Sequence, residues 1–225
     1  MGIEDFFTFV DRNLFSPTDH SKLINLKGSN VIIDGNSFLC FLCNEVNKSA
    51  FENEITIKSV YDLYYQTFLY ALNKFQNNCA SVHFVFDGVF KENQHRKRRS
   101  TRSSSSKVHL STSLFYEEFV GILRCLKIPI HVAQGEGDLL VVQMARQNAA
   151  YIVANDSDYH LYKFDRGYVP LKYFSLETFQ GRLYHMTDIF PGMDQIAVAL
   201  WATTMAFGSI DLDKLKVSSK FSFAM

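Results

Sequence analysis

Six acidic residues follow apolar segments of this chain, in positions where several carboxylates could act together. They are Asp34, Asp87, Glu136, Asp138, Asp156 and Asp158. Carboxylates are hard oxygen ligands that favour Mg²⁺ or Mn²⁺ over softer metals. Two such ions about 3.5–4 Å apart can hold a phosphodiester, one activating the attacking water and the other stabilising the leaving oxygen. The pattern therefore indicates metal-dependent phosphoryl-group chemistry.

The segments before these acids alternate between strand and helix patterns. Apolar, often β-branched runs predict strands at 31–33, 82–86, 128–132 and 150–154, whereas helical spacing of apolar residues marks about 58–77, 114–126, 139–148 and 194–207. After Tyr173 the pattern predicts helix again. Such alternation is typical of βαβ units around a mostly parallel sheet. In a parallel sheet the carboxyl ends of the strands share one edge, so the acids are expected to meet there.

Each acid also has a purely structural interpretation. An Asp-Gly pair after a strand is a common turn signal, and Asp often caps the helix that follows a strand. Taken singly, Asp34 and Asp87 fit a turn better than a metal site. Asp156 and Asp158 carry more weight because alternate positions at a strand end can face the same side. The joint occurrence of all six acids favours the metal site.

A basic segment at about 91–107 interrupts the alternation and ends in a serine-rich run. It contains too little apolar surface for a core, so we expect an exposed and flexible excursion. Its cations could grip phosphates independently of base sequence, or belong to a solvated loop or a nuclear-localisation run. The candidate nucleic-acid-binding residues in it are Lys91, Arg96, Lys97, Arg98, Arg99 and Arg102.

Composition narrows the class of protein. The chain has 225 residues with 23 basic and 23 acidic side chains, so no global field draws it to nucleic acid or membrane. Cys40 and Cys43 form a C-x-x-C inside an apolar run, which favours core thiols over a zinc or redox site and suggests a reducing compartment. We expect neither a signal peptide nor a membrane span, and hence an intracellular protein.

Several motifs, taken in order, resemble those of flap-endonuclease/XPG-type nucleases. The likeness begins with Met1-Gly2-Ile3 and continues with the two Asp-Gly motifs that end strands, Gly135-Glu136-Gly137-Asp138 and Asn155-Asp156-Ser157-Asp158. The asteroid branch is the most similar, because it shares the Asp-Ser-Asp form and a stretch like 164–171. The resemblance spans nearly the whole chain.

This resemblance implies a PIN-like (5′–3′ exonuclease-like) three-layer α/β/α fold as a single domain over 1–225. Its N-terminal part would cover about 1–107 and its internal part about 114–225. The six acids would hold two Mg²⁺ or Mn²⁺ ions, and Gly2 would lie near the cleaved strand. The basic segment would be the family's mobile arch, with Arg98, Arg99 or Arg102 at the scissile phosphate. The implied function is structure-specific cleavage of DNA at a single-strand/duplex junction or overhang, in the nucleus and in DNA repair, with RNA not excluded.

Two departures from the family pattern keep a second function open. Ile210 occupies the place of the family's last acid, and Asp211, a possible further metal ligand, comes one residue late. The family's duplex-holding helix-hairpin-helix is expected to begin near Met225, where the sequence ends. The alternative is a catalytically inactive PIN-like interaction module in signalling or an RNA–protein assembly. A phosphatase-like hydrolase of small phosphates fits the basic segment less well.

Overall fold

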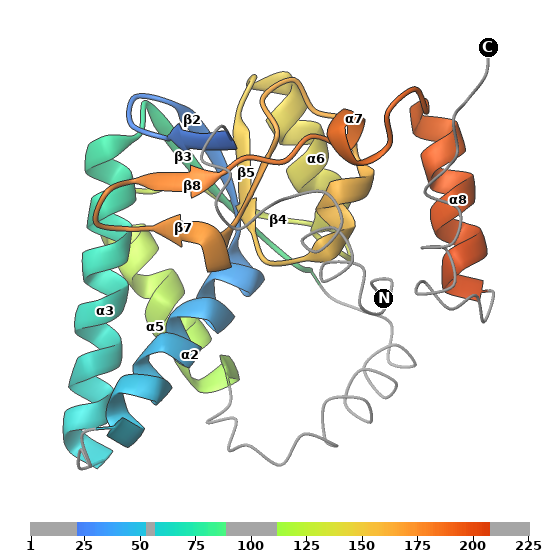
Figure 1. The fold of residues 1–225 in the computed structure, drawn as a ribbon. Coiled ribbons are helices and arrows are strands. Elements are labelled where there is room, and N and C mark those ends of the chain that lie inside the picture. The colour runs from blue at the N-terminus through green and yellow to red at the C-terminus, as the bar shows by residue number, and fades with distance from the viewer. Residues whose placement is uncertain (1–21, 53–56, 89–111, 208–225) are drawn as a thin grey trace.

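The computed structural model describes residues 22–52, 57–88 and 112–207 of the chain (Figure 1). At its centre is a five-stranded sheet in the order β4-β3-β2-β5-β6, and every neighbouring pair is parallel. The strands are β2 (Asn30–Asp34), β3 (Ser81–Phe86), β4 (Ile130–Val132), β5 (Tyr151–Ala154) and β6 (Tyr168–Pro170). A central parallel sheet is thereby confirmed.

The middle strand β2 is apolar on both faces. Val31 and Ile33 pack into one hydrophobic core, and Ile32 between them packs into a second core on the opposite face. All three side chains are fully buried. A strand that is covered on both faces needs apolar side chains at every position, and a continuous β-branched run supplies them. The sequence of β2 therefore fixes a three-layer arrangement.

One face of the sheet is covered by α2 (Gly35–Glu52), α3 (Ile57–Asn78) and α5 (Thr112–Cys125). The core beneath them is strongly aromatic. The Phe38 ring of α2 meets the Phe75 ring of α3 and the Phe84 ring of β3 edge-on, with centroids 5.5 and 5.6 Å apart. Such pairs add to the stabilisation that comes from apolar burial.

The opposite face carries α6 (Asp138–Gln147), the 3₁₀ turn η2 (Ser157–Leu161), α7 (Met186–Ile189) and α8 (Gln195–Phe207). In Figure 1, α6, α7 and α8 lie on the other side of the sheet from α3, with α8 farthest out. Phe190, directly after α7, packs edge-on against Trp201 of α8 with ring centroids 4.9 Å apart. The sheet is thus sandwiched between two helical layers.

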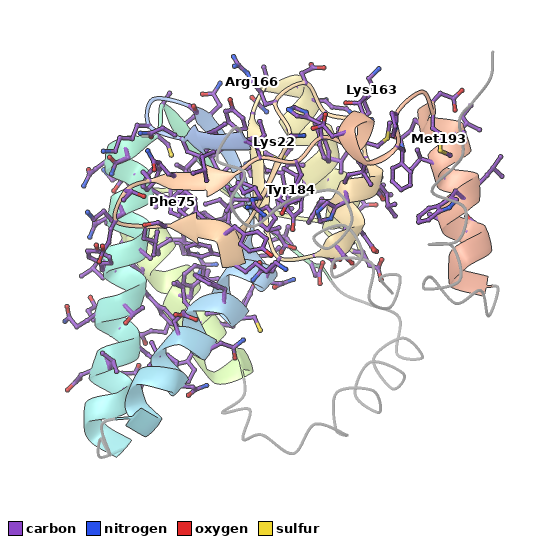
Figure 2. All side chains as sticks on the ribbon, viewed as in Figure 1. Lys22, Phe75, Lys163, Arg166, Tyr184 and Met193 are labelled. Atoms are coloured by element: carbon purple, nitrogen blue, oxygen red, sulfur yellow. The ribbon has the colours of Figure 1, made fainter. Side chains whose placement is uncertain are left out.

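A small antiparallel sheet in the order β1-β8-β7 closes one side of the domain. Its strands are β1 (Leu23–Asn25), β7 (Phe174–Ser175) and β8 (Gln180–Arg182), and the 3₁₀ turn η3 (Leu171–Tyr173) leads into it. Phe75 of α3 contacts the rings of Phe174 and Phe179, at the place where α3 meets β7 and β8 (Figure 2).

The predicted strands and helices are all present, with shifts of a few residues at their ends. Two expectations were wrong. No tight turn follows Asp34, because α2 begins at Gly35 itself, and the helix over 35–52 was not predicted. The chain after Tyr173 forms β7 and β8 before it returns to helix, because β8 pairs with β1 and β7 pairs with β8.

The four cysteines are free thiols. Cys43 lies in the core, and burial raises the pKa of its thiol to about 12, as a core position requires. Among the described residues, none of the helices is both long and apolar enough to cross a membrane.

Candidate functional site

The sheet topology gathers acids at the carboxyl ends of three adjacent strands. Asp34 is the last residue of β2, Asp87 directly follows β3, and Asp156 comes two residues after β5. Asp138 is the first residue of α6, which packs over the same strands. Parallel pairing puts these ends at one edge of the sheet, which is where functional groups gather in open α/β folds.

Asp34 caps the start of α2 and is also one of the acids of the candidate site. The Ser37 N–H donates a hydrogen bond to Asp34 Oδ1 over 3.1 Å, so the carboxylate caps α2. Burial raises the pKa of Asp34 to about 7, and repulsion from Asp138, Asp87 and Asp156 adds to that rise. Asp34 is therefore both a structural cap and a strongly perturbed acid, a combination that marks functional-site candidates.

Asp87 is held by the loop that precedes α6. The Gly137 N–H donates to Asp87 Oδ1 over 2.7 Å, and the Gly88 N–H donates to the Gly135 carbonyl over 2.8 Å. A Cβ on Gly88 would lie 1.8 Å from the Ala133 carbonyl oxygen. The Asp-Gly motif at this strand end thus serves close backbone approach, which only glycine permits.

The glycine of the first Asp-Gly motif is needed for a similar reason. A Cβ on Gly35 would lie 2.4 Å from the Phe86 ring, so α2 can start against β3 only without a side chain there. Gly88 thus lets two backbone segments of the site meet, and Gly35 lets the start of α2 lie against a core ring. Neither Gly35 nor Gly88 has the positive φ that is common for glycines in tight turns.

Tyr159 lies between two of the acids. Its ring is buried in the core on the α6 side, with 1% of the side chain exposed. Its hydroxyl lies 3.1 Å from Asp138 Oδ1 and 3.4 Å from Asp34 Oδ2, so its single proton is shared between two carboxyl groups. Burial and these acids raise the pKa of the phenol, which keeps it a donor. Burial, followed by repulsion from Asp156, also raises the pKa of Asp138, and the Tyr159 hydrogen bond opposes that rise.

Asp156 and Asp158 belong to the turn after β5. Asp156 caps η2, because the Asp158 N–H donates to Asp156 Oδ1 over 3.1 Å. Burial raises the pKa of Asp158 to about 7, and the neighbouring Asp156 adds to the rise. The Asn155 N–H donates to Ser37 Oγ over 2.7 Å, which ties this turn to the start of α2. The two acids are therefore anchored beside Asp34.

The structure brings five of the six predicted acids together and leaves Glu136 at the rim. Glu136 is exposed, but its charge still raises the pKa values of Asp138 and Asp158. The remaining predicted site residues lie outside the described part of the chain: Gly2, Lys91, Arg96, Lys97, Arg98, Arg99, Arg102 and Asp211.

The donor set fits a hard cation. In the ranges 22–52, 57–88 and 112–207, no three His, Cys, Asp or Glu side chains form a ready-made metal cluster. Burial raises the pKa values of Asp34, Asp138 and Asp158, and repulsion from the neighbouring acids adds to each rise. A divalent cation among carboxylates removes such repulsion. Oxygen donors of this kind suit Mg²⁺ or Mn²⁺.

Sequence reasoning missed the groups that position the acids. Ser37 connects α2 to the turn after β5, and Tyr159 connects Asp34 to Asp138. The only sequence signal for Ser37 is its place three residues after an Asp, which is the spacing of a helix cap. Tyr159 has no such signal, because its contacts join residues 125 and 21 positions away in the chain.

Comparison with solved structures finds the same architecture in a catalytic core bound to DNA substrate. The catalytic core of Rad2 in complex with DNA substrate (complex II) superposes with a TM-score of 0.62 at 16% identity, covering 98% of this chain and 68% of that one. A second complex of the same core (complex III) gives 0.61 at 15% identity, with 98% and 69% covered. This chain has the PIN-like fold.

More distant structures overlap less. The Holliday junction-resolving enzyme GEN1, in complex with product DNA, Mg²⁺ and Mn²⁺ ions, gives a TM-score of 0.49 at 15% identity over 87% of this chain and 46% of that one. No protein-family model matches the sequence, and comparison with curated proteins gives no match either. The comparison with the Rad2 core confirms the PIN-like fold, whereas the asteroid branch stays a prediction.

Proposed function

We propose that this chain is a metal-dependent, structure-specific nuclease that hydrolyses phosphodiester bonds of DNA at a single-strand/duplex junction or overhang. The observation that carries the proposal is the convergence of Asp34, Asp87, Asp138, Asp156 and Asp158 at the carboxyl end of one parallel sheet. A shared fold with a nuclease core that binds DNA substrate supports DNA as the polymer.

The proposed metal ligands are Asp34, Asp87, Asp138, Asp156 and Asp158, with Glu136 at the rim and Asp211 as a further candidate. When bound, two divalent ions would supply Lewis-acid stabilisation of the developing charge and a water of lowered pKa. The protein's part is to hold the acids in place. Ser37, Gly137 and the Asp158 N–H fix Asp34, Asp87 and Asp156 before any ligand arrives, which is the preorganisation that such sites depend on.

The basic segment at 91–107 would supply the phosphate grip. We retain Lys91, Arg96, Lys97, Arg98, Arg99 and Arg102 as its candidate contacts and Gly2 as a contact of the cleaved strand. In the sequence the segment begins four residues after Asp87 and precedes α5, so it starts close in the chain to one of the acids. Phosphate contacts of this kind fix position without reading sequence.

The test is cleavage of end-labelled nucleic acids in Mg²⁺ or Mn²⁺. The substrates are single-stranded DNA, duplex, 3′ overhang and 5′ flap, together with their RNA counterparts. We expect the parent protein to cut the junction substrates, and the double variant Asp156→Ala/Asp158→Ala to lose cutting. Asp165→Ala is the matched control, because Asp165 is exposed and lies in the loop before β6, away from the acids. Equal cutting by the parent and the double variant would refute the site.

One observation favours the second candidate, an inactive interaction module. The Tyr159 hydroxyl already bridges Asp34 and Asp138, and a pKa of about 7 leaves Asp34 partly protonated near neutrality. The acids are thus partly neutralised without a cation. Thermal unfolding distinguishes the two candidates, because a cation held by the folded state at a hundredfold excess over its Kd stabilises by about 2.7 kcal/mol. Stabilisation of the parent but not of the double variant supports the nuclease, and stabilisation of neither supports the module.

A further inference from the structure

Two cationic side chains contact the same tyrosine ring. Lys172 Nζ lies 4.6 Å from the centroid of the Tyr173 ring, and Arg182 Cζ lies 5.2 Å from it. Lys172 is exposed, whereas Tyr173 and Arg182 are half-buried. Lys172 and Tyr173 belong to η3, and Arg182 is the last residue of β8. The fold therefore gathers positive charge from two separate elements around one ring.

The cationic pair lies at the same edge of the central sheet as the acids. In the parallel pairing of β5 with β6, Ala154 lies opposite Pro170. Asp156 and Lys172 each come two residues after these partners. Neighbouring strands are about 4.7–4.9 Å apart. The backbone of Lys172 is therefore close to that of Asp156.

Asn155 connects η3 to the acids. The Lys172 N–H donates to Asn155 Oδ1 over 3.0 Å, and the Asn155 N–H donates to Ser37 Oγ over 2.7 Å. The Ser37 N–H in turn donates to Asp34 Oδ1. One series of hydrogen bonds thus runs from Lys172 to Asp34, so the cationic pair is held in place relative to the site.

The stretch that carries the pair is basic. Residues 166–187 include three Lys or Arg side chains and a single acid, Glu177. Glu177 belongs to the turn that joins β7 to β8, whereas Arg182 is at the other end of β8. Because the acids repel a polyanion, positive charge beside them favours its approach. Lys172 and Arg182 supply such charge from outside the basic segment at 91–107.

A cation over an aromatic ring suits phosphate binding. The contact with the ring face uses the positive charge rather than the N–H donors, of which Lys has three and Arg five. Phosphate oxygens accept strong hydrogen bonds from both groups. Because the ring restricts both side chains before a ligand arrives, less conformational freedom is lost on binding.

We propose that Lys172 and Arg182, held against Tyr173, bind the phosphate backbone of a nucleic-acid strand beside the acids. The inference rests on the proposed function, because it names further substrate contacts of the same site. The contacts position the strand without reading its sequence. Each cation that neutralises a phosphate contributes about 0.7–0.9 to the slope of log affinity against log salt concentration, because counterions are released.

Fluorescence anisotropy of a labelled 5′-flap DNA tests the pair. Binding is measured between about 50 and 200 mM KCl, in the Asp156→Ala/Asp158→Ala background so that the DNA stays intact. We expect Lys172→Gln and Arg182→Gln each to weaken binding about fivefold near 0.1 M salt and to reduce the slope by about 0.7–0.9. Lys172→Gln keeps the hydrogen bond to Asn155, because its donor is the backbone N–H.

Arg166→Gln is the matched control. Arg166 is exposed and its Cζ also contacts a tyrosine ring, that of Tyr151, at 5.9 Å. Tyr151 begins β5, so this contact lies at the opposite edge of the sheet from the acids, and Arg166 is near the top of the view in Figure 2. We expect Arg166→Gln, and likewise the charge-preserving Lys172→Arg, to keep the affinity and the slope of the background.

The outcomes separate this inference from the proposed function. If Lys172→Gln binds with the affinity and slope of Arg166→Gln, the inference is overturned, even where the parent protein cuts DNA and even if Arg182→Gln does not fold. Weakened binding by Lys172→Gln, without cutting by the parent, supports the pair and overturns the proposed cleavage. Absence of binding to the flap DNA and to its RNA counterpart overturns both.

Discussion

Replacing Asp34 by Asn is expected to stabilise the metal-free protein and to remove part of its pH dependence. The folded pKa of Asp34 is about 7, against 3.8 for the ordinary carboxyl group. Between these values the folded state holds a proton that the unfolded state has lost. The free energy of unfolding therefore falls as pH rises through this window, by up to about 1.4 kcal/mol per pH unit.

The size of the effect follows from that window of about three pH units. The largest possible gain in the free energy of unfolding is about 4 kcal/mol. The titration of Asp34 is coupled to that of the other acids, which take up part of the effect, so we expect a gain of about 2–4 kcal/mol. Asn is neutral at every pH and its side-chain oxygen can still accept the Ser37 N–H. The gain should be small near pH 4 and nearly complete near pH 8.

Urea denaturation with a chelator present, at about pH 5 and about pH 8, measures the gain. Asp165→Asn is the matched control, because Asp165 is exposed and apart from the acids. Adding Mg²⁺ should then stabilise the parent more than the Asn variant. If the parent and Asp34→Asn lose stability equally between the two pH values, the electrostatic account of the site is refuted.

Three further changes test other parts of the structure. Gly88→Ala should destabilise the protein by about 2 kcal/mol or more, because the added Cβ would lie 1.8 Å from the Ala133 carbonyl oxygen. In Gly121→Ala, within α5, the added Cβ meets nothing within 4 Å, so this variant should be neutral or more stable by about 0.5–1 kcal/mol. Chemical denaturation compares the two variants. Tyr159→Phe keeps the ring but removes the hydroxyl that donates to Asp138, so the pKa of Asp138 should rise. NMR titration of the Asp138 carboxyl carbon measures this pKa. An unchanged pKa would mean that the hydroxyl does not donate to Asp138. Mn²⁺ or Mg²⁺ should raise the melting temperature of the parent and not that of Asp156→Ala/Asp158→Ala, and an equal rise in both would place the ion elsewhere.

The strands were predictable because each combines burial with β-branched or aromatic residues. Val31, Ile32 and Ile33 can be buried only in a strand covered on both faces, and the same holds for most of 82–86 and 150–154. The positions of Asp34 and Asp87 at strand ends followed directly. Because parallel strands end at the same edge of a sheet, the acids at these strand ends could be expected to lie close together.

The start of α2 and the small sheet were not predictable from local patterns. The Asp-Gly pair at Asp34 looks like a turn, but its glycine is demanded by the Phe86 ring, a contact between residues 51 positions apart. β7 and β8 are two and three residues long and carry no strand periodicity. β8 pairs with β1, which comes from the far end of the sequence, and β7 pairs in turn with β8.

The order of strands in the central sheet has a consequence for biogenesis. β2 pairs with β3 nearby, but its other edge pairs with β5, so Val31 lies beside Tyr151, about 120 residues later. During synthesis at about 5–20 residues per second, that edge stays open for several seconds at least. An unpaired edge of Val and Ile is a template for misassociation. Fragments that stop before β5 should therefore aggregate rather than fold, and chaperone capture during translation should peak before residue 151 emerges.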